Sequence, residues 1–560
     1  MAFSLIIEST DNRKQNNSKH RWRITALPVS AFVCLALLLP LIALITIAVS
    51  GDIDNLKHLA STVMPKATRT TLLLMLGVGI FTSAVGFLTA WVIAFYDFPG
   101  RKIFEWALML PLAVPTYISA YAFVEFFSFT GPIQTGVRGL GGFSSSRDYW
   151  FPEIRSLTGT VLVLGVVLYP YVYLSVLSLF RFQGNTIPDS ARTLGAGPLK
   201  TLAKITLPLA RPAIILGVAL ALMETINDIG AVEHLGTNTL TFSIFSVWLN
   251  QGDLPGAAQI ALLLLMIVLV LIFVERWSRG SRRFEDLRGI TSRKNIDRKT
   301  LTGGYTISAF VGCLVPIAMG FGIPVFILGD YAIVRMEEFI DPVLLSAAFS
   351  SICFALIASV LATLCGLVLA YSLRMRPSMQ NGFFVRLASS GYAIPGTLLA
   401  LGIFIPLAAL DNFIDGLARS WLGFATGLLL TGSGFAMVYA YLVRFMAMAE
   451  GTLDVGLKKI SANIDMAARS LGRSKHQTLY TVLLPVLRPA ILTSLLLVFV
   501  EVIKELSATI VLRPFGVNTL ATHVYDFASR SLIEEAAPAC LLIILAGMVP
   551  VAILLKASQR

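Results

Sequence analysis

Four carboxylic acids interrupt two strongly apolar stretches of the sequence. Glu224 and Asp228 lie four residues apart in one stretch, and Glu501 and Glu505 have the same spacing in the other. Residues four apart share one face of a helix, so each pair is predicted to present two carboxylates on the same side. The pattern predicts an acid-lined path. Oxygen ligands suit hard cations, but these acids could equally receive organic cations.

The composition indicates that membrane-spanning helices position these acids. The chain has 560 residues, of which 56% are hydrophobic and 14% charged, and its mean hydropathy is +0.78. An ordinary soluble domain is about a quarter charged and is therefore excluded. We predict an all-α polytopic membrane protein. About twelve stretches reach the roughly 20 apolar residues that a span needs: 25–50, 68–96, 105–128, 159–183, 211–233, 257–276, 303–328, 343–373, 387–410, 422–447, 488–510 and 536–556.

The acids are predicted to lie deep in the bilayer. Glu224 lies about 18 Å along its helix from Pro212, past the middle of a core roughly 30 Å thick. An ionised group there costs about 2.5 to 3.5 kcal/mol, so the acids should face the protein interior. The alternative is a polar network in which Lys504 neutralises Glu501 or Glu505 and Asn227 bonds its neighbours. No stable metal site is expected, because a path that grips its ion tightly cannot release it.

Prolines are predicted to loosen two of the spans. Pro115 lies in the third span and Pro395 in the ninth. Each removes a helical hydrogen bond, which can loosen or kink the helix. An ordinary packing kink would explain them as well.

The basic residues indicate how the chain is oriented. Lys and Arg cluster before the first span, at Arg101 and Lys102, in the connection 189–208, and between Arg276 and Lys299. By the positive-inside rule these connections and both termini are cytoplasmic. The net charge of +12 is explained by these basic cytoplasmic connections, which orient the chain in the membrane. No binding of nucleic acid is expected.

The sequence contains an internal duplication. "VGFLTAW" at 85–91 matches "CGLVLAY" at 365–371, and "GTNTLT" at 236–241 matches "GVNTLA" at 516–521, both at an offset of 280. Each half has six predicted spans, so both halves start on the same side and form a parallel repeat. The predicted divisions are a cytoplasmic tail, a first six-helix domain, a basic cytoplasmic linker and a second six-helix domain, at 1–24, 25–276, 277–302 and 303–560.

One polar connection recurs in both halves. "DSARTLGAGPLKTLAKITLP" at 189–208 returns as "MAARSLGRSKHQTLYTVLLP" at 466–485. Both copies predict a helix, a break and a second helix, with Gly195 or Gly472 ending the first helix in a left-handed conformation. In the second copy Ser461 or Asn463 can cap the first helix.

Small residues in these loops allow close approach of another backbone. Because two loops of the same design face the same side, we expect them to dock two copies of one partner protein. The alternative is an interfacial helical hairpin that only covers the end of the bundle.

These loops resemble the EAA motif of permeases in binding-protein-dependent ABC importers. The first copy departs at Asp189 and Ser190, and the second departs at Met466, where the family has its usual glutamate. In that family the loop forms the coupling helices that insert into the ATPase subunits. The matching positions are Asp189, Ser190, Ala191, Gly195, Ile205, Leu207 and Pro208 in the first copy, and Met466, Ala467, Ala468, Gly472, Val482, Leu484 and Pro485 in the second.

The resemblance implies the partners and the location of the chain. It implies a non-enzymatic permease in the bacterial inner membrane, surrounded by lipid and working with a periplasmic substrate-binding protein. It also implies two copies of an ABC ATPase, which carry the ATP and Mg²⁺, while this chain holds no cofactor. The sequence agrees, because it contains no G-x4-G-K-[ST] phosphate-binding loop.

Two segments resemble the ferric-iron class of these permeases. They are "ETINDIGAVEHLGTNTLT" at 224–241 and "EVIKELSATIVLRPFGVNTLATHVYDFAS" at 501–529, within a single chain that holds both halves. The resemblance implies import of ferric iron. A permease for thiamine or another small cationic solute is the nearest alternative, and polyamine or phosphonate import is more distant. An ion-coupled secondary transporter, whose paired acids carry protons, is a different class that also stays open.

Overall fold

Helices make up nearly all of the described structure. The computed structural model describes Pro28 and residues 30–183, 197–279, 298–375, 377–389, 391 and 394–558. Within them the only strands are β1 (Tyr96–Asp97) and β2 (Lys299–Thr300), which pair in parallel, Tyr96 with Lys299 and Asp97 with Thr300. The predicted all-α fold class is confirmed.

The helices form two compact units, each of which takes segments from both halves of the sequence. Unit one comprises the described part of Met1–Thr46 together with Ser350–Ile503 and Val511–Val517. Unit two comprises the described parts of Ile47–Phe349, Lys504–Ile510 and Asn518–Arg560. The boundaries 25–276 and 303–560 therefore describe the sequence repeat and not the compact units.

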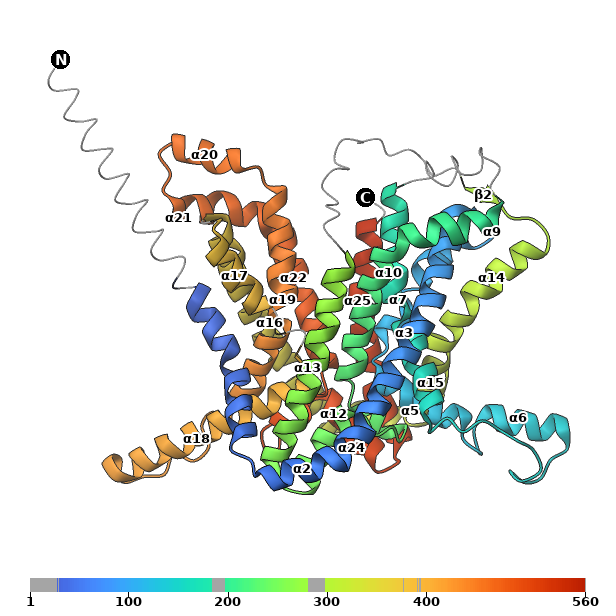
Figure 1. The fold of residues 1–560 in the computed structure, drawn as a ribbon, viewed down its shortest axis with the longest axis horizontal. Coiled ribbons are helices and arrows are strands. Elements are labelled where there is room, and N and C mark those ends of the chain that lie inside the picture. The colour runs from blue at the N-terminus through green and yellow to red at the C-terminus, as the bar shows by residue number, and fades with distance from the viewer. Residues whose placement is uncertain are drawn as a thin grey trace, which may run out of the picture. The chain divides into compact units, whose positions relative to one another are not determined.

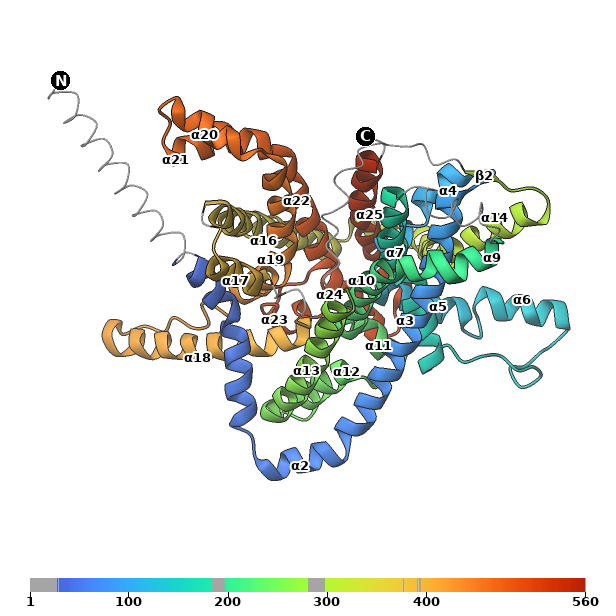
Figure 2. The same cartoon turned by 45° about the horizontal axis from the view of Figure 1, so that its top comes forward.

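Unit one packs three long helices against one another near the end that carries the second repeated loop. Its small core contains Ala370, Leu453, Leu457, Ile460, Leu483 and Leu487. Figures 1 and 2 show α20 and α21 beyond this end of α16, α19 and α22, and α18 at the opposite end. The helices are Ser30–Val49, α16 (Pro342–Met375), α17 (Met379–Ala388), α18 (Gly396–Leu422), α19 (Phe435–Lys459), α20 (Ala462–Ser470), α21 (Lys475–Thr478), α22 (Leu484–Lys504) and α23 (Thr509–Leu512).

Unit two is built around α3, α7 and α10. A Cβ at Gly86 of α3 would lie 2.8 Å from the Tyr169 carbonyl of α7, and one at Gly217 of α10 would lie 2.5 Å from the Val172 Cα. Glycine at these two positions therefore lets both helices approach α7 closely, as is common between membrane helices.

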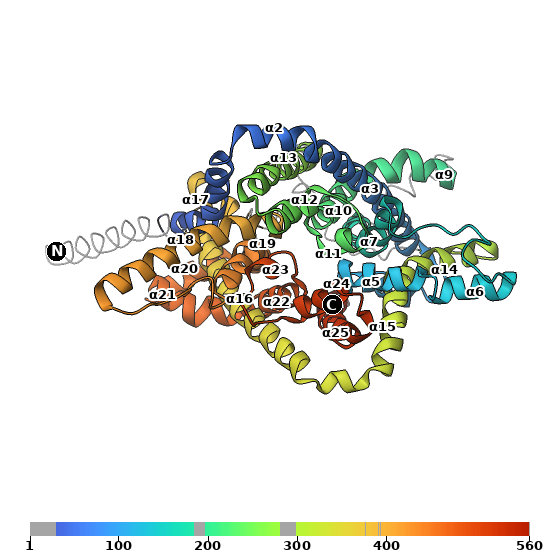
Figure 3. The same cartoon turned by 90° about the horizontal axis from the view of Figure 1, so that it is seen from below.

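Other helices of unit two surround this centre, and Figure 3 shows α24 beside α25 with α5 next to them. The helices are α2 (Ile53–Ser61), α3 (Val63–Phe95), α4 (Arg101–Ala107), α5 (Thr116–Phe127), α6 (Pro132–Gly141), α7 (Leu157–Gln183), α9 (Pro198–Thr201), α10 (Leu207–Asn227), α11 (Gly230–His234), α12 (Leu240–Phe245), α13 (Leu254–Arg279), α14 (Gly304–Ile317), α15 (Ile323–Val334), α24 (Leu520–Ser529) and α25 (Ile533–Ser558).

The count of spans is slightly lower than the twelve predicted. Within the described residues, ten helices are long and apolar enough to cross a bilayer, and eleven if the bent pair Arg101–Ala113 and Thr116–Gly141 is one span. The predicted span 422–447 differs most, because its helix, α19, begins only at Phe435. Gly423, Gly427 and Gly434, all with positive φ, keep the preceding segment irregular.

The two prolines interrupt their spans more completely than a kink. The segments on either side of Val114 and Pro115 meet at 95°. Pro115 directly precedes α5, and Pro395 directly precedes α18, both with extended backbone. Proline fits a position that directly precedes a helix, because it needs no N–H there, so each residue starts a helix instead of bending one.

Candidate functional sites

The second repeated loop has the predicted helix, break and helix. Ser461 precedes α20 and its hydroxyl accepts from the Asn463 N–H at 3.3 Å, so Ser461, and not Asn463, stands at the cap. Gly472 follows α20 with a φ of +81°, which confirms the predicted left-handed break. The next helix begins at Lys475 and continues through a π-helical turn, Leu479–Leu483, into α22.

The motif residues of this loop are mostly exposed. Met466 is 60% exposed and its neighbour Leu471 is 82% exposed, whereas Ala468 is buried. Ala467, Gly472 and Pro485 are also exposed, and Val482 and Leu484 are half-buried. Exposed apolar side chains at the end of a bundle are compatible with a surface that a partner protein covers.

The first repeated loop is described only in its second part. Asp189, Ser190, Ala191 and Gly195 lie outside the described residues. The described chain resumes before α9, which begins at Pro198, in agreement with a second helix after the break. Ile205 and Pro208 are half-buried, and Leu207 is exposed.

Both loops share a π-helical turn that the sequence patterns did not predict. The turns are Leu202–Thr206 and Leu479–Leu483. In the first, the N–H of Leu207 donates to the carbonyl of Leu202, five residues earlier. In the second, the N–H of Leu484 donates to the carbonyl of Leu479 in the same way. Pro208 and Pro485 follow these donors directly and have no N–H to continue an α-helical ladder. The Leu-Pro pair therefore marks the same irregular turn in both repeats.

The acid pairs do not share a helical face as predicted. α10 ends at Asn227 and α22 ends at Lys504, so the second acid of each pair follows the end of its helix. Asp228 has a ψ of 113°, which is extended and not helical. The length of the apolar stretches predicts continuous spans at 211–233 and 488–510, but the helices end at Asn227 and Lys504, directly before an acid.

Asp228 and Glu505 are buried and accept bonds from the backbone beyond the break. Asp228 Oδ1 accepts from the Ala231 N–H at 2.9 Å. Glu505 accepts from the N–H of Ala508 at 2.9 Å and of Thr509 at 3.0 Å, and also from the Thr509 hydroxyl. A carboxylate that satisfies the first N–H groups of a helix acts as its cap. These contacts favour the polar-network interpretation for these two acids, with backbone N–H groups among their partners.

Glu224 and Glu501 occupy the last turns of α10 and α22, and both are half-buried. They stand at equivalent places in the repeat, 277 residues apart. Within the described part of the chain, no group of three or more His, Cys, Asp or Glu residues is placed to hold a metal ion. A role for these two acids along a path therefore stays a prediction.

Unit two contains a polar cavity that the sequence patterns did not indicate. It has a volume of about 250 Å³ and lies between α5, α11, α24 and the segment around Arg155. The Tyr525 hydroxyl donates to Glu233 at 2.8 Å, and the Tyr121 ring meets His234 edge-on at 4.6 Å between centroids. Burial, and secondly the positive charge of Arg155, lower the pKa of His234 from its ordinary 6.5 to about 4. No spacing in the sequence relates these distant residues.

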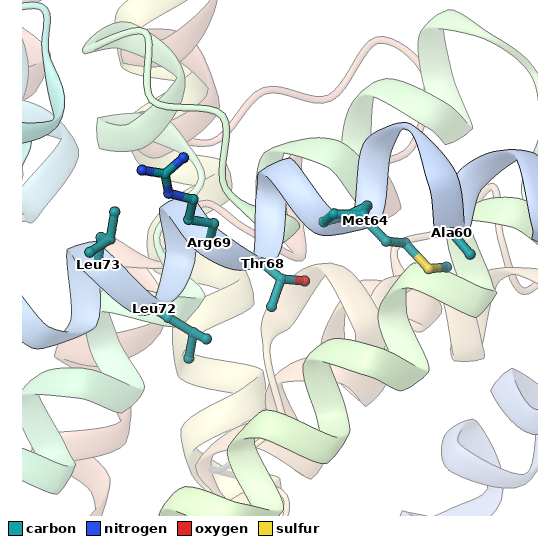
Figure 4. Close-up of a pocket in the computed structure, with 7 residues that line it drawn as sticks. Ala60, Met64, Thr68, Arg69, Leu72 and Leu73 are labelled. Atoms are coloured by element: carbon teal, nitrogen blue, oxygen red, sulfur yellow. The ribbon is translucent and has the colours of Figure 1, made fainter.

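A second cavity, of about 540 Å³, lies along the start of α3. Figure 4 shows its lining residues, from Ala60 near the end of α2 to Leu73 in α3. It contains none of the predicted site residues, so it is a groove on a helix surface and not a candidate site.

Comparison with known proteins places both repeats in one family. Residues 82–282 and 362–560 each match the binding-protein-dependent transport system inner membrane component. The Fe(3+)-transport system permease protein FbpB 2 of Haemophilus influenzae is 26% identical over 503 residues, which is 88% of this chain and 90% of that protein. The sulfate transport system permease protein CysT of Escherichia coli is 30% identical over 43% of this chain and 86% of its own length.

The molybdenum transport system permease protein ModB of Escherichia coli is 26% identical over 35% of this chain and 86% of its own length. The repeated loop with its break at Gly472 and the two family matches thus agree. The chain belongs to the family of inner-membrane components of binding-protein-dependent transport systems.

Proposed function

We propose that this chain is the permease subunit of an ATP-driven importer and carries ferric iron from a periplasmic binding protein into the cytoplasm. The observation that carries this proposal is the similarity to the Fe(3+)-transport permease, which extends over 88% of the chain and so includes both repeats. The similarities to sulfate and molybdenum permeases each cover less than half of it. Ferric iron is therefore the cargo best supported by similarity over the full length of the chain.

The repeated loops are proposed to receive two copies of an ATPase subunit on the cytoplasmic side. The exposed Met466 and Leu471 offer apolar contacts, and the small Ala467 allows close approach of another backbone. The absence of a phosphate-binding loop from the sequence supports placing ATP and Mg²⁺ on those partner subunits. Movement driven by ATP would then reach the membrane helices through α20 and its counterpart in the first repeat.

The acids suited to a passing cation are Glu224 and Glu501. Asp228 and Glu505 already cap helices, whereas these two are half-buried on the last turns of α10 and α22. A carboxylate is a suitable transient partner for a hard cation such as Fe³⁺. If the cation contacts one carboxylate at a time and is never fully coordinated by the protein, it can be released into the cytoplasm.

Transport into proteoliposomes tests this proposal. The chain is reconstituted with its ATPase and with the binding protein encoded beside it, loaded with Fe³⁺, and iron inside the vesicles is measured with and without ATP. We expect accumulation of iron only when ATP, the ATPase and the binding protein are all present. ATP-driven uptake of sulfate, molybdate or thiamine in place of iron would contradict the cargo. Uptake by the chain alone down a proton gradient would contradict the ATP-driven mechanism.

A further inference from the structure

One guanidinium group in unit one joins three helices, α16, α19 and α20, at the second repeated loop. Arg374, in the last turn of α16, donates from Nε to Asp465 Oδ2 at 2.9 Å. Its Nη1 donates to the carbonyls of Leu457 at 2.6 Å and Ile460 at 3.1 Å, and its Nη2 donates to the carbonyl of Ser461 at 3.3 Å. Four acceptors from α19, α20 and the connection between them thus meet one side chain.

The placement of these acceptors explains why an arginine suits the site. Leu457 and Ile460 lie at the end of α19, where the last carbonyls have no partner within the helix and the helix dipole is negative. Asp465 lies in the first turn of α20, where a negative charge is favourable. The planar guanidinium has five N–H donors in a fixed arrangement, so it can satisfy the carbonyls and the carboxylate together.

This contact is shielded, and other buried contacts of α20 are few. The side chains of Arg374 and Asp465 are only 14% and 16% exposed, unlike those of an ordinary surface ion pair. Ala468 is the one buried side chain among those of α20 that the structure describes. The direction in which α20 leaves α19 therefore depends strongly on Arg374.

We propose that Arg374 is the positioning residue of the second docking loop, holding α20 at a fixed angle to α16 and α19 so that movement of a bound ATPase subunit reaches the membrane helices. This inference rests on the proposed function, since it assigns a role within the docking of the ATPase. Arg374 itself contacts neither ATP nor cargo in this scheme. It acts through α20.

The anchor belongs to one repeat only. The match of 85–91 with 365–371 makes Ala94 the counterpart of Arg374, and the match between the loops makes Pro188 the counterpart of Asp465. Neither alanine nor proline can form an ion pair. By sequence the first repeat thus lacks this ion pair, and we expect loss of the anchor to affect the second loop alone.

Hydrogen exchange on the purified chain, without any ATPase, tests the anchor directly. We expect amides 466–471 to exchange about tenfold faster or more in Arg374→Ala and in Asp465→Asn than in the unmodified chain. The first loop, 189–208, should be unchanged in the same samples. Arg419→Ala is the matched control, because Arg419 also pairs with an aspartate, Asp415 at 2.6 Å, but is 65% exposed. Unchanged exchange at α20 in both anchor variants would overturn the proposal.

Coupling in the assembled complex tests the consequence. We expect Arg374→Ala to retain the ATPase on purification but to lower its maximal transport-stimulated ATP hydrolysis at least fivefold, with the concentration of binding protein needed for half-stimulation unchanged. Arg374→Lys keeps the charge but lacks the planar set of donors, so it should restore only part of the rate. If the ATPase binds and Arg374→Ala couples normally, the positioning role is wrong. If no ATPase binds even the unmodified chain, the proposed function fails, while the exchange result on α20 still decides whether the anchor exists.

Discussion

The Ser507 hydroxyl donates to the backbone carbonyl of Asn227 at 2.8 Å, although 280 residues separate them. Asn227 is the last residue of α10, and Ser507 follows the end of α22. The same contact region contains the two capped breaks, at Asp228 and Glu505, inside unit two. In both repeats, therefore, a membrane helix ends at an acid that caps the following segment. The two helix breaks lie in the same compact unit.

Loss of a capping acid should lower stability. In Glu505→Ala the N–H groups of Ala508 and Thr509 lose their acceptor in a buried place, which costs about 1–3 kcal/mol for each unsatisfied group. Glu505→Gln keeps one carbonyl oxygen as an acceptor, so its unfolding temperature should lie between those of Glu505→Ala and the unmodified chain. Thermal unfolding in detergent measures this effect, with Glu337→Ala as a control because Glu337 is exposed. A Glu505→Ala chain that melts at the unmodified temperature would contradict the assignment as a cap.

The half-buried acids should behave differently. Replacing Glu224 or Glu501 by alanine should lower iron uptake about tenfold or more, because a carboxylate that a passing cation contacts is removed. Retention of the ATPase should be unchanged, since both acids lie in the last turns of α10 and α22 and not in the docking loops. Iron uptake is measured in proteoliposomes, and retention of the ATPase is measured by its co-purification with the chain. Collapse of assembly in these variants would show that the two acids belong to a structural network and not to a path.

The glycine break in the second loop should be needed for coupling. Gly472 has a φ of +81° and Gly451 does not have a positive φ, although a Cβ at either would meet nothing within 4 Å. Valine at Gly472 therefore costs backbone strain of about 1–2 kcal/mol or more. Gly472→Val should leave the chain inserted in the membrane but abolish most transport-stimulated ATP hydrolysis, and a bulky residue at Gly195 should do the same.

The matched control for this experiment is Gly451→Val, in the helix interior of α19. It adds the same side chain in open space without the left-handed backbone. Equal coupling in the two valine variants would show that the left-handed break is not needed.

His234 should make stability depend on pH. Its pKa is about 4 in the folded chain, below its ordinary 6.5, because burial and Arg155 disfavour the charged form. Between pH 4 and 6.5 the unfolded chain therefore binds more protons than the folded chain, so this contribution is full above pH 6.5 and is lost as pH falls towards 4. The loss is at most about 3.5 kcal/mol, since the pKa falls from 6.5 to about 4 and each pKa unit corresponds to about 1.4 kcal/mol.

The comparison of His234→Phe with the unmodified chain isolates this effect. Phenylalanine keeps an aromatic ring against Tyr121 but cannot take up a proton. Unfolding temperatures measured from pH 7 to pH 4.5 should fall less steeply in the variant than in the unmodified chain. As a control, His58→Gln changes an exposed histidine, and its unfolding temperature should fall with pH as steeply as that of the unmodified chain. Identical slopes in all three chains would contradict the lowered pKa.

The sequence by itself determined the features that depend on local composition. Long apolar stretches require helices in a bilayer, because each backbone group must be satisfied within its own segment. Repetition of the loop at 189–208 and 466–485 indicated a duplicated permease. The glycine in the second copy predicted the break observed at Gly472, because few other residues adopt a left-handed backbone at low cost.

Only the tertiary structure decided where the spans containing the acids end and what the acids contact. Apolar residues lie on both sides of Asp228 and Glu505, so the sequence predicts continuous spans, whereas the acceptors and donors that stabilise each break are specified by the folded backbone. The four contacts of Arg374 and the bond from Ser507 to Asn227 join residues 83 to 280 positions apart. Such contacts leave no periodic pattern in a single sequence, because they arise only when distant helices pack together.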